Sequence, residues 1–127
     1  MKYTLQVLAA MLLFSVVAPS LSAQNAGDVV PISEARQASD GESVTIEGVI
    51  TRVDGGTAFI QDESAALAIQ DANGVGFADS LSSGYISQSD SVRLAGTKTE
   101  DQNLVVVNPA SDSFERLSGN NDLPEYQ

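Results

Sequence analysis

The sequence predicts a small all-β protein, a five-stranded Greek-key barrel with a short N-terminal helix. Two observations predict this fold class. From residue 43 onward, apolar residues recur at every second position in short runs, which is the period of strands and not of helices. The third and fourth runs are separated by a long irregular segment, which is typical of five-stranded Greek-key barrels.

A short helix is expected to precede the first strand. Ser33 offers a side-chain hydroxyl as an N-cap, and residues 34–38 are good helix formers with an acidic residue first. Asp40 and Gly41 are expected to end this helix. It is long enough to cover one end of a barrel.

The first strand is expected to be long and bent. Its apolar residues lie at even positions in 44–46 and at odd positions in 49–53, so the pattern shifts by one residue around Gly48. Such a shift at a glycine predicts a β-bulge or a sharp coil. The strand can then serve both sides of a small barrel. Residues 54–56, Asp-Gly-Gly, form a tight hairpin turn into the second strand.

The other strands follow from the same alternation. A proline after residue 108 is expected to end the fifth, because proline cannot continue a ladder. A short edge strand over residues 113–117 and a helical turn over residues 78–82 are further expectations. The remaining strands are expected at residues 57–62, 66–70, 91–99 and 104–107.

The order of these elements is that of an OB-fold, and three segments resemble a known group. Residues 44–50 (VTIEGVI), 58–63 (AFIQDE) and 92–96 (VRLAG) resemble the OB-fold modules of exported bacterial proteins. Such modules occur attached to secreted nucleases and to uncharacterised surface proteins. The periplasmic bacterial OB-fold (BOF) family is similar too. The resemblance covers about residues 32–117, and implies a fold without a catalytic constellation.

The N-terminus resembles a secretory signal peptide. Residues 1–23 begin with a positive charge, continue with an apolar run and end in small residues. Cleavage is expected after Ala23, or a few residues earlier, and an uncleaved membrane anchor is the alternative. The protein is therefore expected to be exported, either periplasmic or secreted to the cell surface, with no membrane span after cleavage. Residues 24–31 are expected to be a flexible lead-in, and residues 118–127 a disordered tail or a linker.

Composition excludes much enzyme chemistry. The chain has no histidine and no cysteine, so histidine-based catalysis, thiolate metal sites and disulfides are excluded. Five cations and seventeen acids remain once Lys2 leaves with the signal peptide, so the mature charge is near −12. That charge repels polyanions, and disfavours nucleic acid as a partner. We expect no enzyme activity and no cofactor.

Phe59 is the leading candidate for a ligand contact. If Ala58 and Ile60 point into the barrel, Phe59 and Gln61 point outward on the face where OB-folds usually bind. An exposed aromatic there can stack on a base or a sugar ring. The alternative is that Phe59 packs inward or beneath the helix.

Three cations and two aromatics complete the candidates. Arg52, Arg93 and Lys98 lie at strand positions that face outward, where they form either a local positive stripe or ordinary surface ion pairs, and pairing is favoured. Tyr85 and Phe77 lie in the long connection, where they line a groove or, more commonly, anchor the loop.

Carboxylates gather near the expected loop ends, at Asp54, Asp62, Glu63 and Asp71. Calcium would suit such ligands outside a cell, but the spacing of a calcium loop is missing. We expect turn residues and no metal site. The leading prediction is an exported, non-catalytic module that binds an extracellular oligomer or a partner protein, and the alternative is a single-stranded nucleic-acid-binding domain.

Overall fold

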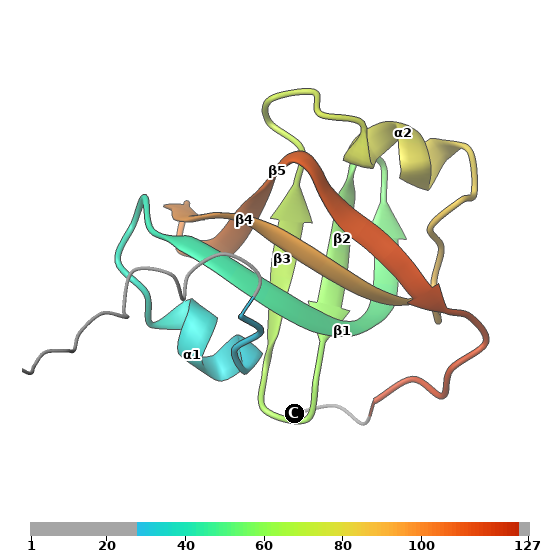
Figure 1. The fold of residues 1–127 in the computed structure, drawn as a ribbon, viewed down its shortest axis with the longest axis horizontal. Helices are drawn as coiled ribbons and strands as arrows, with labels where there is room; N and C mark the ends of the chain where they lie inside the picture. The colour runs from blue at the N-terminus through green and yellow to red at the C-terminus, as the bar shows by residue number, and fades with distance from the viewer. Residues whose placement is uncertain (1–27, 125–127) are drawn as a thin grey trace, which may run out of the picture.

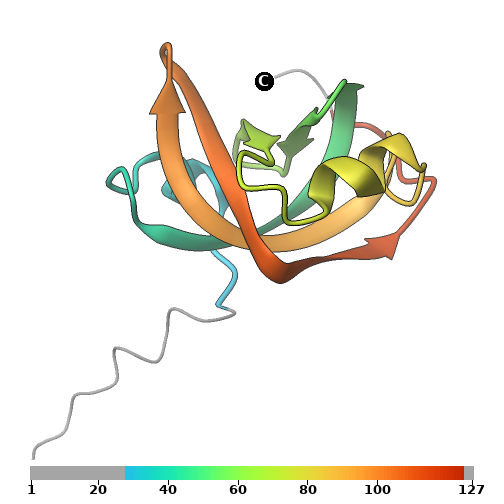
Figure 2. The same cartoon turned by 90° about the horizontal axis from the view of Figure 1, so that it is seen from above.

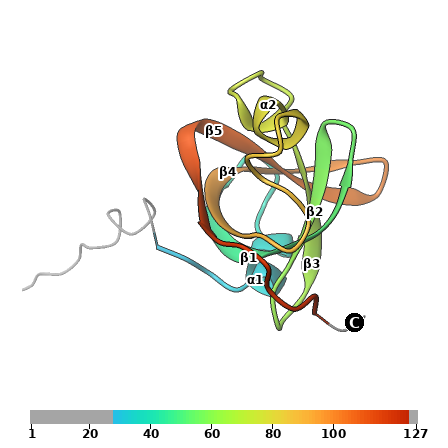
Figure 3. The same cartoon turned by 90° about the vertical axis from the view of Figure 1, so that its right-hand side faces the viewer.

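Five strands close into a ring in the order β1-β2-β3-β5-β4 (Figures 1 and 3). The computed structural model describes residues 28–124, so the expected signal peptide lies outside the described residues. The all-β, five-stranded barrel that the sequence predicts is confirmed. The strands are β1 (Ser43–Asp54), β2 (Thr57–Gln61), β3 (Ala66–Gln70), β4 (Ser91–Asp101) and β5 (Leu104–Ser118).

Strand β1 is shared between two neighbours, as the sequence predicts. Its first half, Ser43 to Val49, pairs antiparallel with β4, and its second half, Val49 to Asp54, pairs antiparallel with β2. On the other side of the ring, β3 and β5 pair in parallel through two residue pairs. The long β4–β5 hairpin projects from the barrel (Figure 2).

The prediction that the core-facing residues of β1 switch from even to odd positions at Gly48 is wrong. Ile46 and Ile50 are both fully buried, so the even positions of β1 face the core on both sides of the glycine. The register shifts later, between Ile50 and Arg52. Gly48 has a different role, because a Cβ there would lie 2.6 Å from the carbonyl oxygen of Gln61. It permits two backbones to approach closely.

Strand β5 continues through Pro109, which corrects the expected end of the fifth strand. Pro109 lies opposite Gly96 in the β4–β5 ladder, and Phe114 lies opposite Leu94. The residues between them form an irregularity, and the expected edge strand at 113–117 is the second half of β5. Pro109 is fully buried and lies at the start of this bulge, a place where a strand tolerates proline.

Two short helices lie on opposite sides of the barrel (Figures 1 and 3). Helix α1 (Ile32–Arg36) has Pro31 and not Ser33 at its N-cap, without a side-chain cap from that residue. Helix α2 (Phe77–Ser82) forms where the helical turn is expected, within the long connection. Each helix adds two side chains to the hydrophobic core, which are Ile32, Ala35, Phe77 and Leu81.

Both ends of the described chain contact the barrel. The backbone N–H of Val30 donates to the carbonyl of Thr45 at 2.9 Å, beside β1. After β5, the backbone and side chain of Asn121 both donate to the carbonyl of Ser89. The packed chain therefore extends past residue 117, the expected boundary of the domain. No helix within residues 28–124 has the length and apolar character needed to cross a membrane.

Gly96→Ala is expected to destabilise the barrel strongly. A Cβ at this position would overlap the carbonyl oxygen of Asn108, so a strand would have to move. We expect the free energy of unfolding in urea to fall by about 3 kcal/mol. Gly56→Ala is the matched control, because its Cβ would meet only Ala78, at 3.7 Å. Equal losses in the two variants would contradict the close-approach explanation.

Candidate functional site

Arg52 and Phe59 form a planar surface on the outside of the barrel. They are paired across β1 and β2, and the guanidinium carbon lies 5.7 Å from the centre of the Phe59 ring. That distance allows a cation–π interaction. Phe59 is half-buried, and the Arg52 side chain is 67% exposed. Ala58 and Ile60 on either side point into the core, as predicted. We call Arg52 and Phe59 the β1–β2 platform.

The register places Phe59 at the edge of a covered row. Phe59 pairs with Ala68 on β3, and Ala68 pairs with Val106 on β5. Ala68 and Val106 are both buried, with at most 1% of their surface exposed. The accessible part of the platform is therefore limited to Arg52 and the exposed part of Phe59.

Two predicted site residues are not available on this surface. Gln61 is only 6% exposed, although its position along β2 suggested an outward side chain. Lys98 is 5% exposed and lies at an even position of β4, like Leu94, which faces the core. Its Nζ lies 2.9 Å from the Asp40 carboxylate. The expectation of accessible side chains is therefore wrong for both residues.

Arg93 does not extend the platform into a positive stripe. Its side chain forms an ion pair with Glu47 across β4 and β1, at 2.6 Å. The other cations of the described residues are also engaged. Arg36 donates to a backbone carbonyl, Arg52 lies 3.3 Å from Asp54, and Arg116 pairs with Asp90. The expectation of ordinary ion pairing is therefore confirmed for the predicted stripe.

The two aromatics of the long connection behave differently. Phe77 is fully buried and makes an edge-to-face contact with Phe114, with ring centres 5.3 Å apart, so it anchors the connection as expected. Tyr85 is 58% exposed and is not an anchor. Its loop is held to β1 next to the platform, because the Gln88 side chain donates to the carbonyl of Thr51 at 2.9 Å.

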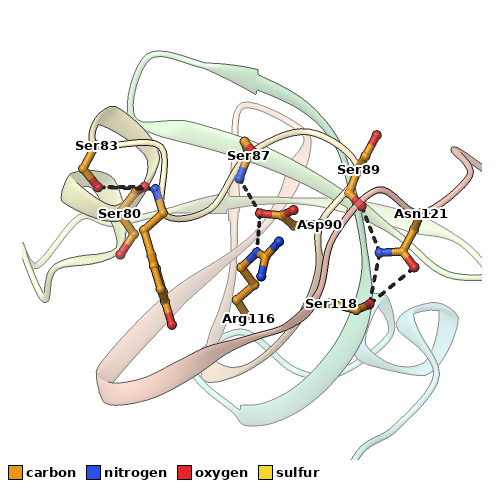
Figure 4. Close-up of polar contacts among 9 residues, drawn as sticks. Ser80, Ser83, Ser87, Ser89, Asp90, Arg116, Ser118 and Asn121 are labelled. Carbon is orange, nitrogen blue, oxygen red and sulfur yellow. Dashed lines mark hydrogen bonds and ion pairs between the residues drawn. The ribbon is translucent and has the colours of Figure 1, made fainter.

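A buried carboxylate that the sequence pattern did not single out fixes the end of this loop. Asp90 is 4% exposed, lies 3.1 Å from the Arg116 guanidinium, and accepts from the backbone of Ser87 (Figure 4). Asn121 donates to Ser89 beside it. The partners are far apart in sequence, so no local signal identified this cluster. It positions the loop that carries Tyr85.

Asp62 holds helix α1 from outside that helix. It follows β2 directly and accepts hydrogen bonds from the backbone of Ile32 at 2.9 Å and from the turn after β2. Burial acts to raise the pKa of Asp62, but hydrogen bonds from the Ser64 side chain and three backbone N–H groups lower it below its usual 3.8. The carboxylate replaces the missing local cap.

Asp71 holds helix α2 in the same way. It follows β3 directly and accepts from the backbones of Val75, Gly76 and Ala78 at 2.9, 3.2 and 3.1 Å. Burial acts to raise the pKa of Asp71, but the backbone N–H groups lower it below 3.8. Both acids are engaged as helix caps, and within residues 28–124 no three carboxylates gather closely enough to hold a metal ion.

Comparison with known proteins identifies the fold. No protein-family model and no curated protein matches the chain. Among solved structures, the hypothetical protein YgiW from E. coli matches with a TM-score of 0.53 and 21% identity, over 72% of this chain and 91% of that one. The closed ring of five strands in this chain is the architecture of an OB-fold. The fold is an OB-fold.

Two further solved structures are similar at lower scores. The telomere-capping protein Ten1 from Saccharomyces pombe has a TM-score of 0.47 and 15% identity, over 62% of this chain and 73% of that one. OBody AM1L10, solved bound to hen egg-white lysozyme, has a TM-score of 0.49 and 16% identity, over 62% and 81%. At these identities the likeness concerns the OB-fold and not its ligand.

The double variant Asp62→Asn/Asp71→Asn, which replaces both helix-capping acids, is expected to be less stable at neutral pH. Folding lowers the pKa of both carboxyl groups, so each carboxylate stabilises the folded state at pH values above its unfolded pKa of 3.8. This stabilisation is lost as the pH falls through the pKa of the folded state. We expect a loss of about 1 kcal/mol per cap, measured by urea unfolding. The acid-induced fall in stability should also become shallower. Glu63→Gln, at an exposed neighbour, should change neither quantity.

Proposed function

We propose that this chain is an exported, non-catalytic OB-fold domain that binds an extracellular oligomer or a partner protein through the β1–β2 platform. The observation that carries the proposal is the position of the exposed Arg52 guanidinium over the Phe59 ring, 5.7 Å from its centre. The pair lies on the outer face that OB-folds commonly use for ligands. Export is supported by the signal-like residues 1–23.

Two features support binding rather than conversion. The sequence has no histidine or cysteine. Asp62 and Asp71, two of the four clustered carboxylates considered as calcium ligands in the sequence, accept backbone hydrogen bonds as helix caps. Their lowered pKa values keep them ionised at neutral pH, which does not suit a general acid.

Single-stranded nucleic acid is the second candidate, because an arginine next to an aromatic ring is typical of such sites. Charge opposes it. The described cations are each already engaged with an oxygen of the protein, and the complete chain carries a formal net charge of −11. A neutral oligomer or a protein suits this surface better, since neither requires a row of free cations.

The test is an NMR titration at physiological salt with chitohexaose as a neutral oligomer and oligothymidylate as an anionic one. We expect chitohexaose to shift the amides of Arg52 and Phe59, and Phe59→Ala to weaken that binding about tenfold through loss of the stacking contact. Leu117→Ala, at an apolar side chain 39% exposed elsewhere, should leave it unchanged.

A photo-crosslinking residue at position 59, with position 117 as control, tests the partner-protein branch in the exporting cell. A specific adduct from position 59 alone would support it. If oligothymidylate shifts the platform amides and added salt abolishes the effect, the nucleic-acid candidate replaces the proposal. If neither oligomer shifts the amides and no adduct forms at position 59, the platform is not the binding surface.

A further inference from the structure

A second surface, apart from the platform, has the chemistry of a binding site. A groove of about 610 Å³ lies between α1 and the start of β1. Its accessible apolar lining includes Val30, Ala38 and Val44, and its acidic lining consists of Asp28, Glu34 and Glu42. We call it the α1–β1 groove. Its volume is in the range of sites that accept small ligands or a few side chains of a partner.

No cation within residues 28–124 compensates the negative charge of the groove, although the Glu42 carboxylate accepts the backbone N–H of Ser39 at 3.0 Å. Within the described residues, none of its carboxylates forms an ion pair, and no lysine or arginine lines it. Arg36, the cation of α1, donates instead to the carbonyl of Ala66 on β3. Lys98 is held by Asp40. The groove is therefore a local concentration of negative potential over an apolar lining.

Thr45 provides a second, independent sign of a ligand. It lines the groove and is only 5% exposed, yet within residues 28–124 its hydroxyl has no hydrogen-bond partner. Its backbone carbonyl does have one, in the N–H of Val30. A buried hydroxyl without a partner lowers the stability of the folded state, because it has lost its hydrogen bonds to water. A ligand that enters the groove can supply the missing hydrogen bond.

We propose that the α1–β1 groove binds a lysine- or arginine-bearing segment of a partner protein. Long cationic side chains combine an aliphatic stem with a charged head. The stem packs on Val30, Ala38 and Val44, and the head reaches the carboxylates of Glu34 and Glu42. A polar backbone or side-chain atom of the segment completes the hydrogen bonding of the Thr45 hydroxyl.

This inference goes beyond the proposed function, because the groove and the platform share no residue. The groove lies at the start of β1 and the platform near its end. The net negative charge of the chain also favours the approach of a cationic partner. The two surfaces can therefore be tested separately on the same protein.

The experiment measures binding of a fluorescent hexapeptide of alternating lysine and threonine by anisotropy at low salt, with a glutamate–threonine hexapeptide as the charge control. We expect Glu34→Gln with Glu42→Gln to weaken binding of the lysine peptide about fivefold. The matched control is Glu63→Gln with Glu100→Gln, which removes the same charge at exposed sites outside the groove. This control should change the affinity less than twofold, because dissolved ions screen charges that lie far from the bound peptide.

Thr45→Val separates binding from folding. Removing an unpartnered hydroxyl should leave the melting temperature unchanged or raise it, while binding of the lysine peptide weakens about threefold. The Phe59→Ala variant should bind the peptide with unchanged affinity. A failure of the groove proposal is therefore distinguishable from a failure of the platform proposal. Equal losses in the two double variants, or no binding at low salt, would overturn the proposal. Spermine binding as tightly as the peptide, unaffected by Thr45→Val, would also overturn it in favour of a simple polycation site.

Discussion

Closure of one small sheet into a ring is the constraint on which the rest of this structure depends. A chain without cysteine must stabilise the barrel through packing alone, and the strands must therefore bend sharply while their backbones stay in contact. Gly48 and Gly96 make this possible, because a side chain at either position would collide with a neighbouring carbonyl. With the ring closed, Ile46, Ile50 and Leu94 share one interior, and the helices cover it from opposite sides.

The two short helices show how the barrel determines the use of its acids. Neither helix is long enough to be stable alone, and neither has a local side-chain cap. Asp62 and Asp71, each directly after a strand, supply the caps from the barrel. The same contacts lower both pKa values and leave the carboxylates ionised and engaged. Two acids that were considered as calcium ligands in the sequence thus serve to attach the helices.

The surface that remains divides by charge. Arg52 and Phe59 form a stacked pair on the outer face of β1 and β2, and the charge of Arg52 is partly offset by Asp54. Within residues 28–124, the carboxylates of the α1–β1 groove form no ion pair, and the buried hydroxyl of Thr45 has no hydrogen-bond partner. We therefore propose different ligands for the two surfaces, a flat or aromatic group at the platform and a cationic chain in the groove.

The sequence by itself determined the strand alternation, the hairpin after Asp54, the fold class and the outward position of Phe59, since these depend on local periodicity and turn chemistry. Only the tertiary structure decided the course of β5 through Pro109 and the burial of Gln61 and Lys98. The physical reason is that these features depend on partners distant in the chain. The bulge opposite Gly96, the ion pair from Lys98 to Asp40, and the helix cap from Asp62 each join segments that no local pattern relates.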